Sequence, residues 1–132
     1  MQLTARMKVA FATQDLAHVD AHFGWTPHLV VYEVTPEGFR LEQTHAFAPA
    51  EEDGVEDKLA PRIAAITGCA LVCVAAIGPS AAARLAQHRI RPATAAGETR
   101  IEALLARLCH LLASGPPPWL RRAVGEEQEE AA

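Results

Sequence analysis

The apolar run CALVCVAAIG, residues 69–78, constrains the fold of this 132-residue chain more than any other segment. It is almost continuously apolar, β-branched at its centre and ended by a glycine. Such a strand is typical of a parallel sheet that helices cover on both faces. Its length is about half of what a membrane-spanning helix needs. The run therefore predicts the central strand of an α/β fold.

The segments around this run supply the remaining elements of such a fold. Alternating or β-branched composition predicts four further strands: residues 7–13, 28–35, 39–47 and 90–96. Apolar residues at helical spacing predict three helices: residues 57–67, 79–89 and 97–115. Asp57 is expected to cap the first helix, and Pro92 to confine the last strand to a sheet edge. The order of elements predicts a three-layer α/β sandwich around a five-stranded mixed sheet.

The hairpin and the cysteines give predictions about which residues share a face. Residues 39–47 alternate strictly, so one face of that strand is expected to carry Phe39, Leu41, Gln43, His45 and Phe47. Cys69 and Cys73 are four apart in a predicted strand, which places both on one face as buried apolar residues. Together with Cys109 they are too few for an iron–sulfur centre of four thiolates, and an odd count argues against a disulfide framework.

Length and charge predict one domain with short flanking segments. Residues 7–115 form the domain, residues 1–6 an N-terminal extension, and residues 116–132 a proline-rich and then acidic tail. The net charge is −4, and because the segment EEQEE at residues 126–130 carries four of the 16 acids, the other 12 acids balance the 12 lysines and arginines. A neutral body without a basic stripe disfavours nucleic acid as a partner. No apolar run reaches membrane-spanning length and the start is not leader-like, which predicts a cytoplasmic protein without a membrane partner.

Three histidines lie within eleven residues of a predicted loop, in the sequence HVDAHFGWTPH. They are His18, His22 and His28, and their separations of four and six match no closed zinc pattern. His22 lies in mid-loop, where its ring is either free to meet a metal or bonded to the backbone. His18 lies near Asp20, which predicts either a solvated pair or a group that supports a ligand. His28 opens a strand and is expected to be structural.

A second loop, with the sequence IGPSA, opens the helix after the central strand. Gly78 allows a ligand to approach the backbone, and the N–H groups from Ser80 to Ala82 are expected to point outward with the positive end of the helix dipole. The carboxyl ends of parallel strands meet at one edge of a sheet, so this loop and the histidine loop are expected to lie together. The sequence therefore predicts a site for an anionic ligand at that edge, with amides on one side and an imidazole on the other.

The sequence does not contain the motifs of common enzymes. A two-metal nuclease with this order of elements along the chain needs carboxylates on its first strand, and residues 7–13 contain none. Asp15 and Asp20 lie beyond that strand, and Glu33 has no identifiable partner. No Ser-His-Asp arrangement can be assembled, and no phosphate-binding or dinucleotide fingerprint occurs. The chain is therefore predicted to bind a ligand and not to be an enzyme.

Five segments together resemble the nitrogenase iron–molybdenum cofactor biosynthesis family: KVAFAT, HVDAHFGW, YEVTPEGFRL, EDGVEDKLAPRIAAITGCALVCVAAIG and GPPPWLRRAV. The resemblance covers roughly residues 7–124. It implies a ribonuclease-H-like fold without nuclease activity. It also implies a carrier whose transient cargo is an iron–sulfur cluster precursor of the iron–molybdenum cofactor, or the mature cofactor. The implied partners are the radical enzyme that synthesises the cluster, the cofactor scaffold protein that receives it, and apo-nitrogenase.

The resemblance makes His22 of the HFG triplet the candidate metal ligand or hydrogen-bond partner of the cargo. With the two loops described above, the predicted cofactor-binding residues are His22, Phe23, Gly24, Gly78, Ser80 and His18. Some distant relatives carry a cysteine just before HFG, where this chain has Ala21, so thiolate ligation from this loop is not expected. Phe23 and Trp25 either shield the cargo from water or pin the loop to the core.

An alternative function is a docking module for apo-nitrogenase or for the scaffold protein, without cargo of its own. The tail segment PPPWLRRAV supports this alternative, because a tryptophan and two arginines after a rigid proline run can form a contact element. The same Trp119 can instead pack back on the domain.

Overall fold

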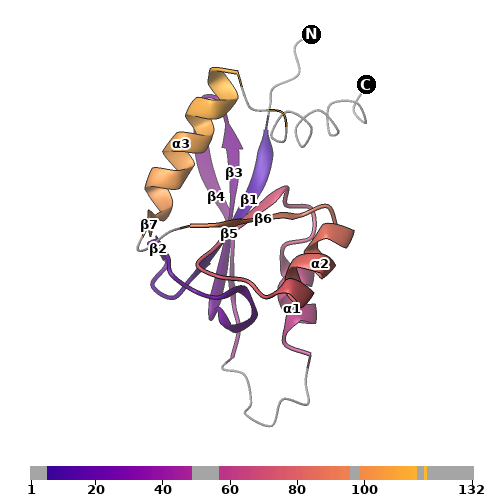
Figure 1. Cartoon of the computed structure of the whole chain (residues 1–132). Helices are drawn as coiled ribbons and strands as arrows, with labels where there is room; N and C mark the ends of the chain where they lie inside the picture. The colour runs from indigo at the N-terminus through magenta and orange to yellow at the C-terminus, as the bar shows by residue number, and fades with distance from the viewer. Residues whose placement is uncertain (1–5, 49–56, 96–98, 116–117, 119–132) are drawn as a thin grey trace.

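A computed structural model describes residues 6–48, 57–95, 99–115 and 118. Across these residues, five strands form one mixed sheet in the order β4-β3-β1-β5-β6 (Figure 1). The strands are β1 Met7–Thr13, β3 His28–Thr35, β4 Gly38–Ala46, β5 Leu71–Val74 and β6 Arg91–Thr94. The helices are α1 Leu59–Ala65, α2 Pro79–Gln87 and α3 Ile101–Ala113. The predicted α/β fold with a five-stranded mixed sheet is confirmed, and β1 and β3 have the predicted bounds.

The strand β1 lies at the centre of the sheet, between an antiparallel half and a parallel half. It is antiparallel to β3 and parallel to β5, and β5 is parallel to β6. Every residue of β5 is buried, because helices cover the sheet on both faces. Pro92 lies in β6 at the edge of the sheet, where a missing N–H donor is tolerated. The ribonuclease-H-like label that the resemblance implies stays a prediction.

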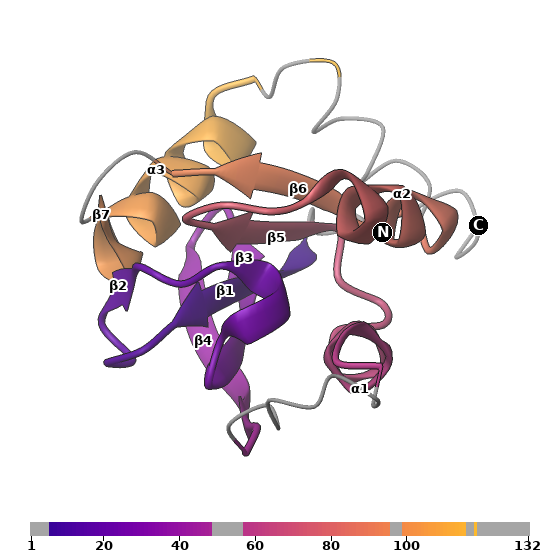
Figure 2. The same cartoon turned by 60° about the horizontal axis from the view of Figure 1, so that its bottom comes forward.

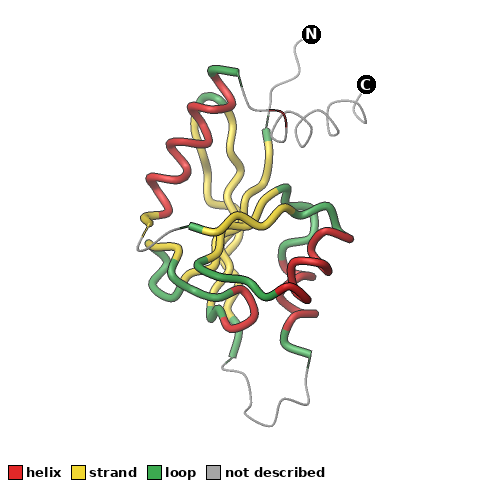
Figure 3. Tube along the Cα trace, in the orientation of Figure 1, coloured by secondary structure: helices red, strands yellow, loops and turns green. Residues whose placement is uncertain are grey.

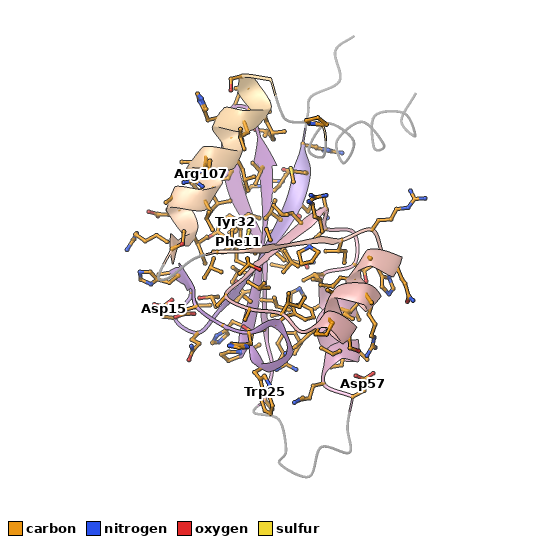
Figure 4. The ribbon with its side chains drawn as sticks, in the orientation of Figure 1. Phe11, Asp15, Trp25, Tyr32, Asp57 and Arg107 are labelled. Atoms are coloured by element: carbon orange, nitrogen blue, oxygen red, sulfur yellow. The ribbon has the colours of Figure 1, made fainter. Side chains whose placement is uncertain are left out.

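Helices form a layer on each face of the sheet (Figure 2). α1 and α2 cover one face, where Ile63 and Leu85 pack in the same cluster as Val72. α3 covers the other face, where Phe11 meets Tyr32 edge to face with ring centroids 5.8 Å apart (Figure 4). The three layers are those that the sequence predicts. No helix in the described ranges is long and apolar enough to cross a membrane.

The strict alternation predicted for residues 39–47 is wrong. Val31 pairs with Gln43, but the next residue, Tyr32, pairs with Leu41, so one residue of β4 is left without a partner. An unpaired residue of this kind reverses the side-chain alternation on its far side. Phe39 therefore shares a face with Tyr32, at a ring centroid distance of 6.0 Å, whereas Gln43 lies on the opposite face.

Two short strands that the sequence did not predict join the histidine loop to α3. β2 His18–Val19 pairs antiparallel with β7 Thr99–Arg100. Ile101, the first residue of α3, donates its N–H to the carbonyl of Ala17 at 2.8 Å. The helix predicted from residue 97 therefore begins only at Ile101, because the residues before it extend along β2.

The cysteines Cys69 and Cys73 lie in different cores, so their predicted common face is wrong. Cys69 precedes β5, in a turn where its N–H bonds the Ile66 carbonyl at 3.0 Å, and it packs on the α1–α2 side. Cys73 lies within β5 and packs on the α3 side. The two-residue period of a strand did not apply because Cys69 is outside the strand. Burial raises the pKa of both thiols to about 12, so neither is a ready source of thiolate.

The sequence also predicted where the first helix begins and which segments flank the domain. The predicted N-cap, Asp57, is wrong, because α1 begins at Leu59 and its N-cap is Lys58, whose side chain makes no capping hydrogen bond. Asp57 lies one residue further out, where it accepts the N–H of Leu59 at 3.1 Å and so satisfies a free amide at the start of the helix. The predicted N-terminal extension and C-terminal tail lie outside the described residues, apart from Arg6 and Pro118.

Candidate functional site

The histidine loop and the loop after β5 lie side by side at the carboxyl edge of the sheet. Figure 3 shows the histidine loop between β1 and β3 in green, interrupted by the short strand β2 in yellow and by a helical turn in red. His22 forms an isolated parallel bridge with Ala76. The N–H of Phe23 bonds the carbonyl of Ala76 at 3.0 Å. Because Ala76 lies two residues before Gly78, the structure brings together the two loops in which the sequence placed a ligand site.

His22 presents its imidazole to solvent. The residue is exposed and precedes the 3₁₀ helix η1, Phe23–Trp25, but its side chain does not cap that helix. Within the described part of the chain, its ring makes no hydrogen bond or ion pair. The backbone of His22 is therefore bonded to its neighbours while the ring is free. A free imidazole can offer a ring nitrogen to a metal or a proton.

The two aromatic residues of η1 occupy different environments. Phe23 is fully buried in the core on the α1–α2 side, so it pins the loop and does not shield a ligand. Trp25 is 62% exposed and projects from the lower edge of the molecule in Figure 4. The Nζ of Lys58 lies 3.2 Å from the centroid of the Trp25 ring, which is a cation–π distance. A Cβ at Gly24 would lie 3.5 Å from the side chain of Leu59, an ordinary contact, so packing does not require a glycine there.

Arg62, a residue to which the sequence analysis gave no role, holds the far end of this turn. It lies on α1 and is 4% exposed. Its Nη2 and Nε donate to the carbonyl of Thr26 at 2.8 and 3.2 Å, and its Nη1 donates to the carbonyl of Lys58 at 3.0 Å. Burial lowers the pKa of the guanidinium, which nevertheless stays charged. The sequence carried a signal for this position, because residues 59, 62, 63 and 66 follow the spacing of a helix face turned to the core.

The N-terminus of α2 follows the loop after β5 and lies at the same edge of the sheet as His22. Gly78 has φ −79°, and a Cβ there would meet nothing within 4 Å, so neither conformation nor packing requires a glycine. Ala82 donates its N–H to the carbonyl of Gly78 at 3.0 Å. The amides expected to be free from Ser80 to Ala82 are therefore reduced to those of Ser80 and Ala81, which precede the first donor within the helix. Ser80 is exposed.

The pairing suggested for His18 is wrong, because its partner is Asp15 and not Asp20. His18 Nδ1 lies 2.7 Å from Asp15 Oδ2, and Asp15 Oδ1 accepts the N–H groups of Ala17 and His18 at 2.9 and 2.8 Å. Asp20 instead accepts the N–H of Gln14 at 2.8 Å. His18 is also part of β2, so it is committed to the structure of the turn.

We expect Asp15→Ala to destabilise the protein at neutral pH and much less in acid. The N–H of Ala17, the side chain of His18 and the N–H of His18 hold the pKa of Asp15 well below its ordinary value. A carboxyl with a lowered native pKa stabilises the fold above its unfolded pKa, and this contribution is lost as the pH falls through the native value. Urea unfolding from neutral to acidic pH should therefore give a difference in unfolding free energy that shrinks toward acid.

Glu37→Ala is the control for this prediction, since Glu37 is an exposed carboxylate in the turn between β3 and β4. Its effect on the unfolding free energy should be small and nearly constant over the same pH range. A difference between Asp15→Ala and the unaltered protein that grows toward acid would contradict the role given to Asp15.

The third histidine of the loop lies inside the sheet. His28 is the first residue of β3 and pairs with Thr13 and Ala46. Its Nδ1 is buried and has no hydrogen-bond partner in the ranges that the structure describes. The residue is therefore placed as a part of the sheet, away from the exposed ring of His22.

A shallow depression adjoins the imidazole of His22. It has a volume of about 330 Å³ and is lined by Gln14, Asp20, Ala21, His22, Trp25 and Pro27. In the portion of the chain that the structure describes, no three His, Cys, Asp or Glu side chains form a group that could hold a metal ion. A ligand in the depression would therefore meet one imidazole and one carboxylate, and no preformed cage of ligands.

Known proteins share both the sequence and the fold of this chain. A family model described as dinitrogenase iron-molybdenum cofactor matches residues 5–110. Protein NifX of Herbaspirillum seropedicae is 51% identical over 124 residues, which cover 93% of this chain and 85% of that protein. Protein NifY of Azotobacter vinelandii is 28% identical over 124 residues, covering 94% of this chain but 50% of that protein.

The crystal structure of PH0822 superposes with a TM-score of 0.51 over 86% of this chain and 97% of that chain. At 18% identity, this likeness concerns the fold alone. The family match and the identity to NifX carry the assignment, and they agree with the resemblance seen in the five sequence segments. The chain belongs to the dinitrogenase iron–molybdenum cofactor family, and its role lies in the biosynthesis or carrying of that cofactor.

Proposed function

We propose that the protein is a non-catalytic carrier of an iron–sulfur cluster precursor of the iron–molybdenum cofactor. The cargo would come from the radical enzyme that synthesises the cluster and pass to the cofactor scaffold protein. The observation that supports the proposal is the free, exposed imidazole of His22 at the sheet edge, beside the loop that opens α2. Membership of the family supports the pathway, and the nature of the cargo is our inference.

The cargo-binding residues that we propose have separate roles. His22 would bind an iron of the cluster or donate a hydrogen bond to it. The amides of Ser80 and Ala81, with the positive end of the α2 dipole, would face a sulfide or another anionic group, and Gly78 leaves the approach open. Phe23 would fix the turn that carries His22, and His18 would hold the start of the loop through Asp15.

A carrier that must release its cargo should bind it through a small number of ligands. The irons of a preassembled cluster are already bridged by sulfide, so the carrier need not complete their coordination. A single imidazole with neutral amides binds less firmly than a set of thiolates, which favours transfer to a partner with more ligands. The two buried cysteines, Cys69 and Cys73, do not compete for the iron, because burial raises the pKa of their thiols to about 12.

Anaerobic co-expression with the cluster-synthesising enzyme tests the proposal. We expect the purified protein to be brown, to contain iron and acid-labile sulfide, and to lose both when mixed with the scaffold protein. A colourless protein that takes up neither iron nor sulfide under these conditions would refute the carrier role. The same preparation distinguishes a precursor from the mature cofactor, because only the mature cofactor contains molybdenum.

A docking role without cargo is the second candidate. It is favoured by the exposed apolar side chains near the same edge, Trp25 at 62% and Leu16 at 48% exposure. A colourless protein that still forms a complex with apo-nitrogenase or the scaffold protein would support this candidate. Trp25→Ala should then abolish the complex, whereas it should leave a cargo bound through His22 largely in place.

A further inference from the structure

We propose that Arg62 is a positioning residue for His22, acting as a buried clamp on the turn that carries the imidazole. The inference rests on the proposed carrier function and adds to it a residue that lies outside the cargo site. It starts from the hydrogen bonds of Arg62, from the two anchors of the turn, and from the position of the guanidinium between them.

The turn from His22 to Thr26 is fixed at both ends. At its start, His22 bridges to Ala76 and the N–H of Phe23 bonds the Ala76 carbonyl at 3.0 Å. Inside the turn, the N–H of Trp25 bonds the carbonyl of His22 at 3.1 Å. At its end, the carbonyl of Thr26 accepts two N–H groups of Arg62, at 2.8 and 3.2 Å. The position of the His22 ring therefore depends on an anchor four residues away.

Arg62 is held rigidly enough to serve as that anchor. Its guanidinium also donates to the carbonyl of Lys58, at 3.0 Å, so it ties the turn to the start of α1. The guanidinium carbon lies 4.6 Å from the centroid of the Phe47 ring, and stacking on an aromatic face fixes the plane of the fork. Thr26 itself is fully buried and donates its hydroxyl to the carbonyl of His28 at 2.7 Å.

The shape of the Arg62 guanidinium suits its position in the structure. Within the described residues, the guanidinium bonds only to backbone carbonyls and pairs with no carboxylate. An arginine is useful here because its planar fork can bond the carbonyls of Thr26 and Lys58 at once.

The experiment compares Arg62→Met with Arg84→Met in protein loaded with the cluster under anaerobic conditions. Arg84 is the matched control, because it pairs with the exposed carboxylate of Asp57 at 3.0 Å. We expect Arg62→Met to weaken iron retention on gel filtration by about 10- to 100-fold, the range found when groups behind a metal ligand are removed. It should also speed hydrogen exchange of the Trp25 amide. Arg84→Met should change neither.

A double variant separates positioning from a general structural effect. If Arg62 acts through His22, then His22→Ala combined with Arg62→Met should retain no less iron than His22→Ala alone. Losses that add in the double variant would overturn the proposal. So would Arg62→Met protein that exchanges the Trp25 amide faster but retains iron like the unaltered protein.

Arg62→Lys keeps the test open should Arg62→Met fail to fold. Lysine retains the charge and can donate to one of the two carbonyls but lacks the fork. Iron retention and protection of the Trp25 amide should both be intermediate, and full retention with lost protection would overturn the clamp. If the unaltered protein never binds iron, the carrier function fails. If it binds iron through His22 and the Arg62 variants bind equally well, only the role of Arg62 fails.

Discussion

His22→Ala is expected to lower the affinity for the cluster by about 100-fold or more. Removing a residue that supports a metal ligand typically lowers metal affinity about 10- to 100-fold, and removing the ligand itself should lower it further. The free imidazole at the sheet edge is the one side chain in the adjoining depression suited to binding iron as a neutral ligand. Iron and sulfide retained after anaerobic gel filtration measure the loss. The fold should be intact, because the His22 ring is exposed and the variant should change the unfolding free energy by less than about 0.5 kcal/mol.

His45→Ala is the matched control for this prediction. His45 lies on β4 and its Nε2 is 2.9 Å from the side-chain oxygen of Gln43, so it is a surface histidine engaged away from the loop. The control should retain iron like the unaltered protein. Equal retention in the two histidine variants would remove His22 from the site and leave the carrier function without its proposed ligand.

The second large effect is expected from Phe23→Ala, which should lower the free energy of unfolding by about 3–5 kcal/mol. Phe23 is fully buried and packs in the core on the α1–α2 side, so its removal leaves a cavity directly beneath the turn. Urea unfolding measures the change. Cargo retention should fall as well, because the turn that carries His22 would no longer be anchored by a side chain packed in the core.

Phe39→Ala is the control for the cavity argument. Phe39 is 43% exposed and touches Tyr32 edge to face at a centroid distance of 6.0 Å. Its removal should lower the unfolding free energy by about 1 kcal/mol, within the range of a partly exposed aromatic pair. Comparable losses from the two phenylalanine variants would show that Phe23 does not hold the loop through core packing.

Most of the fold could be predicted from the sequence because its signals are local. The strands over residues 7–13 and 28–35 have the predicted bounds. The apolar run 69–78 does contain a buried strand with two parallel neighbours, but this strand covers only residues 71–74, and β1 takes the central place in the sheet that was predicted for the run. The register shift in β4 could not be predicted, because it is a property of the pair β3–β4 and not of either sequence alone. β2 and β7 were missed for the same reason, since they pair across about 80 residues of chain.

The relative position of the two loops could be predicted, because the topology of the sheet alone determines it. The rule that the ends of parallel strands meet at one edge correctly placed the His22 loop beside the loop of Gly78. The prediction that His18 pairs with Asp20 was wrong. The chain turns so that Asp15 lies against His18, while Asp20 accepts a hydrogen bond from Gln14. Arg62 was missed although its spacing placed it on the inner face of α1, because a charged side chain is ordinarily assigned to the surface.

Nitrogen coupling to the bound cluster tests the central claim most directly. The loaded protein would be labelled with ¹⁵N in its histidines, poised in a redox state with unpaired spin, and examined by pulsed electron paramagnetic resonance. An imidazole nitrogen of His22 bound to iron predicts a ¹⁵N coupling in the unaltered protein and in His45→Ala, and its loss in His22→Ala. A coupling that survives His22→Ala, or loaded protein that shows none, would contradict the account.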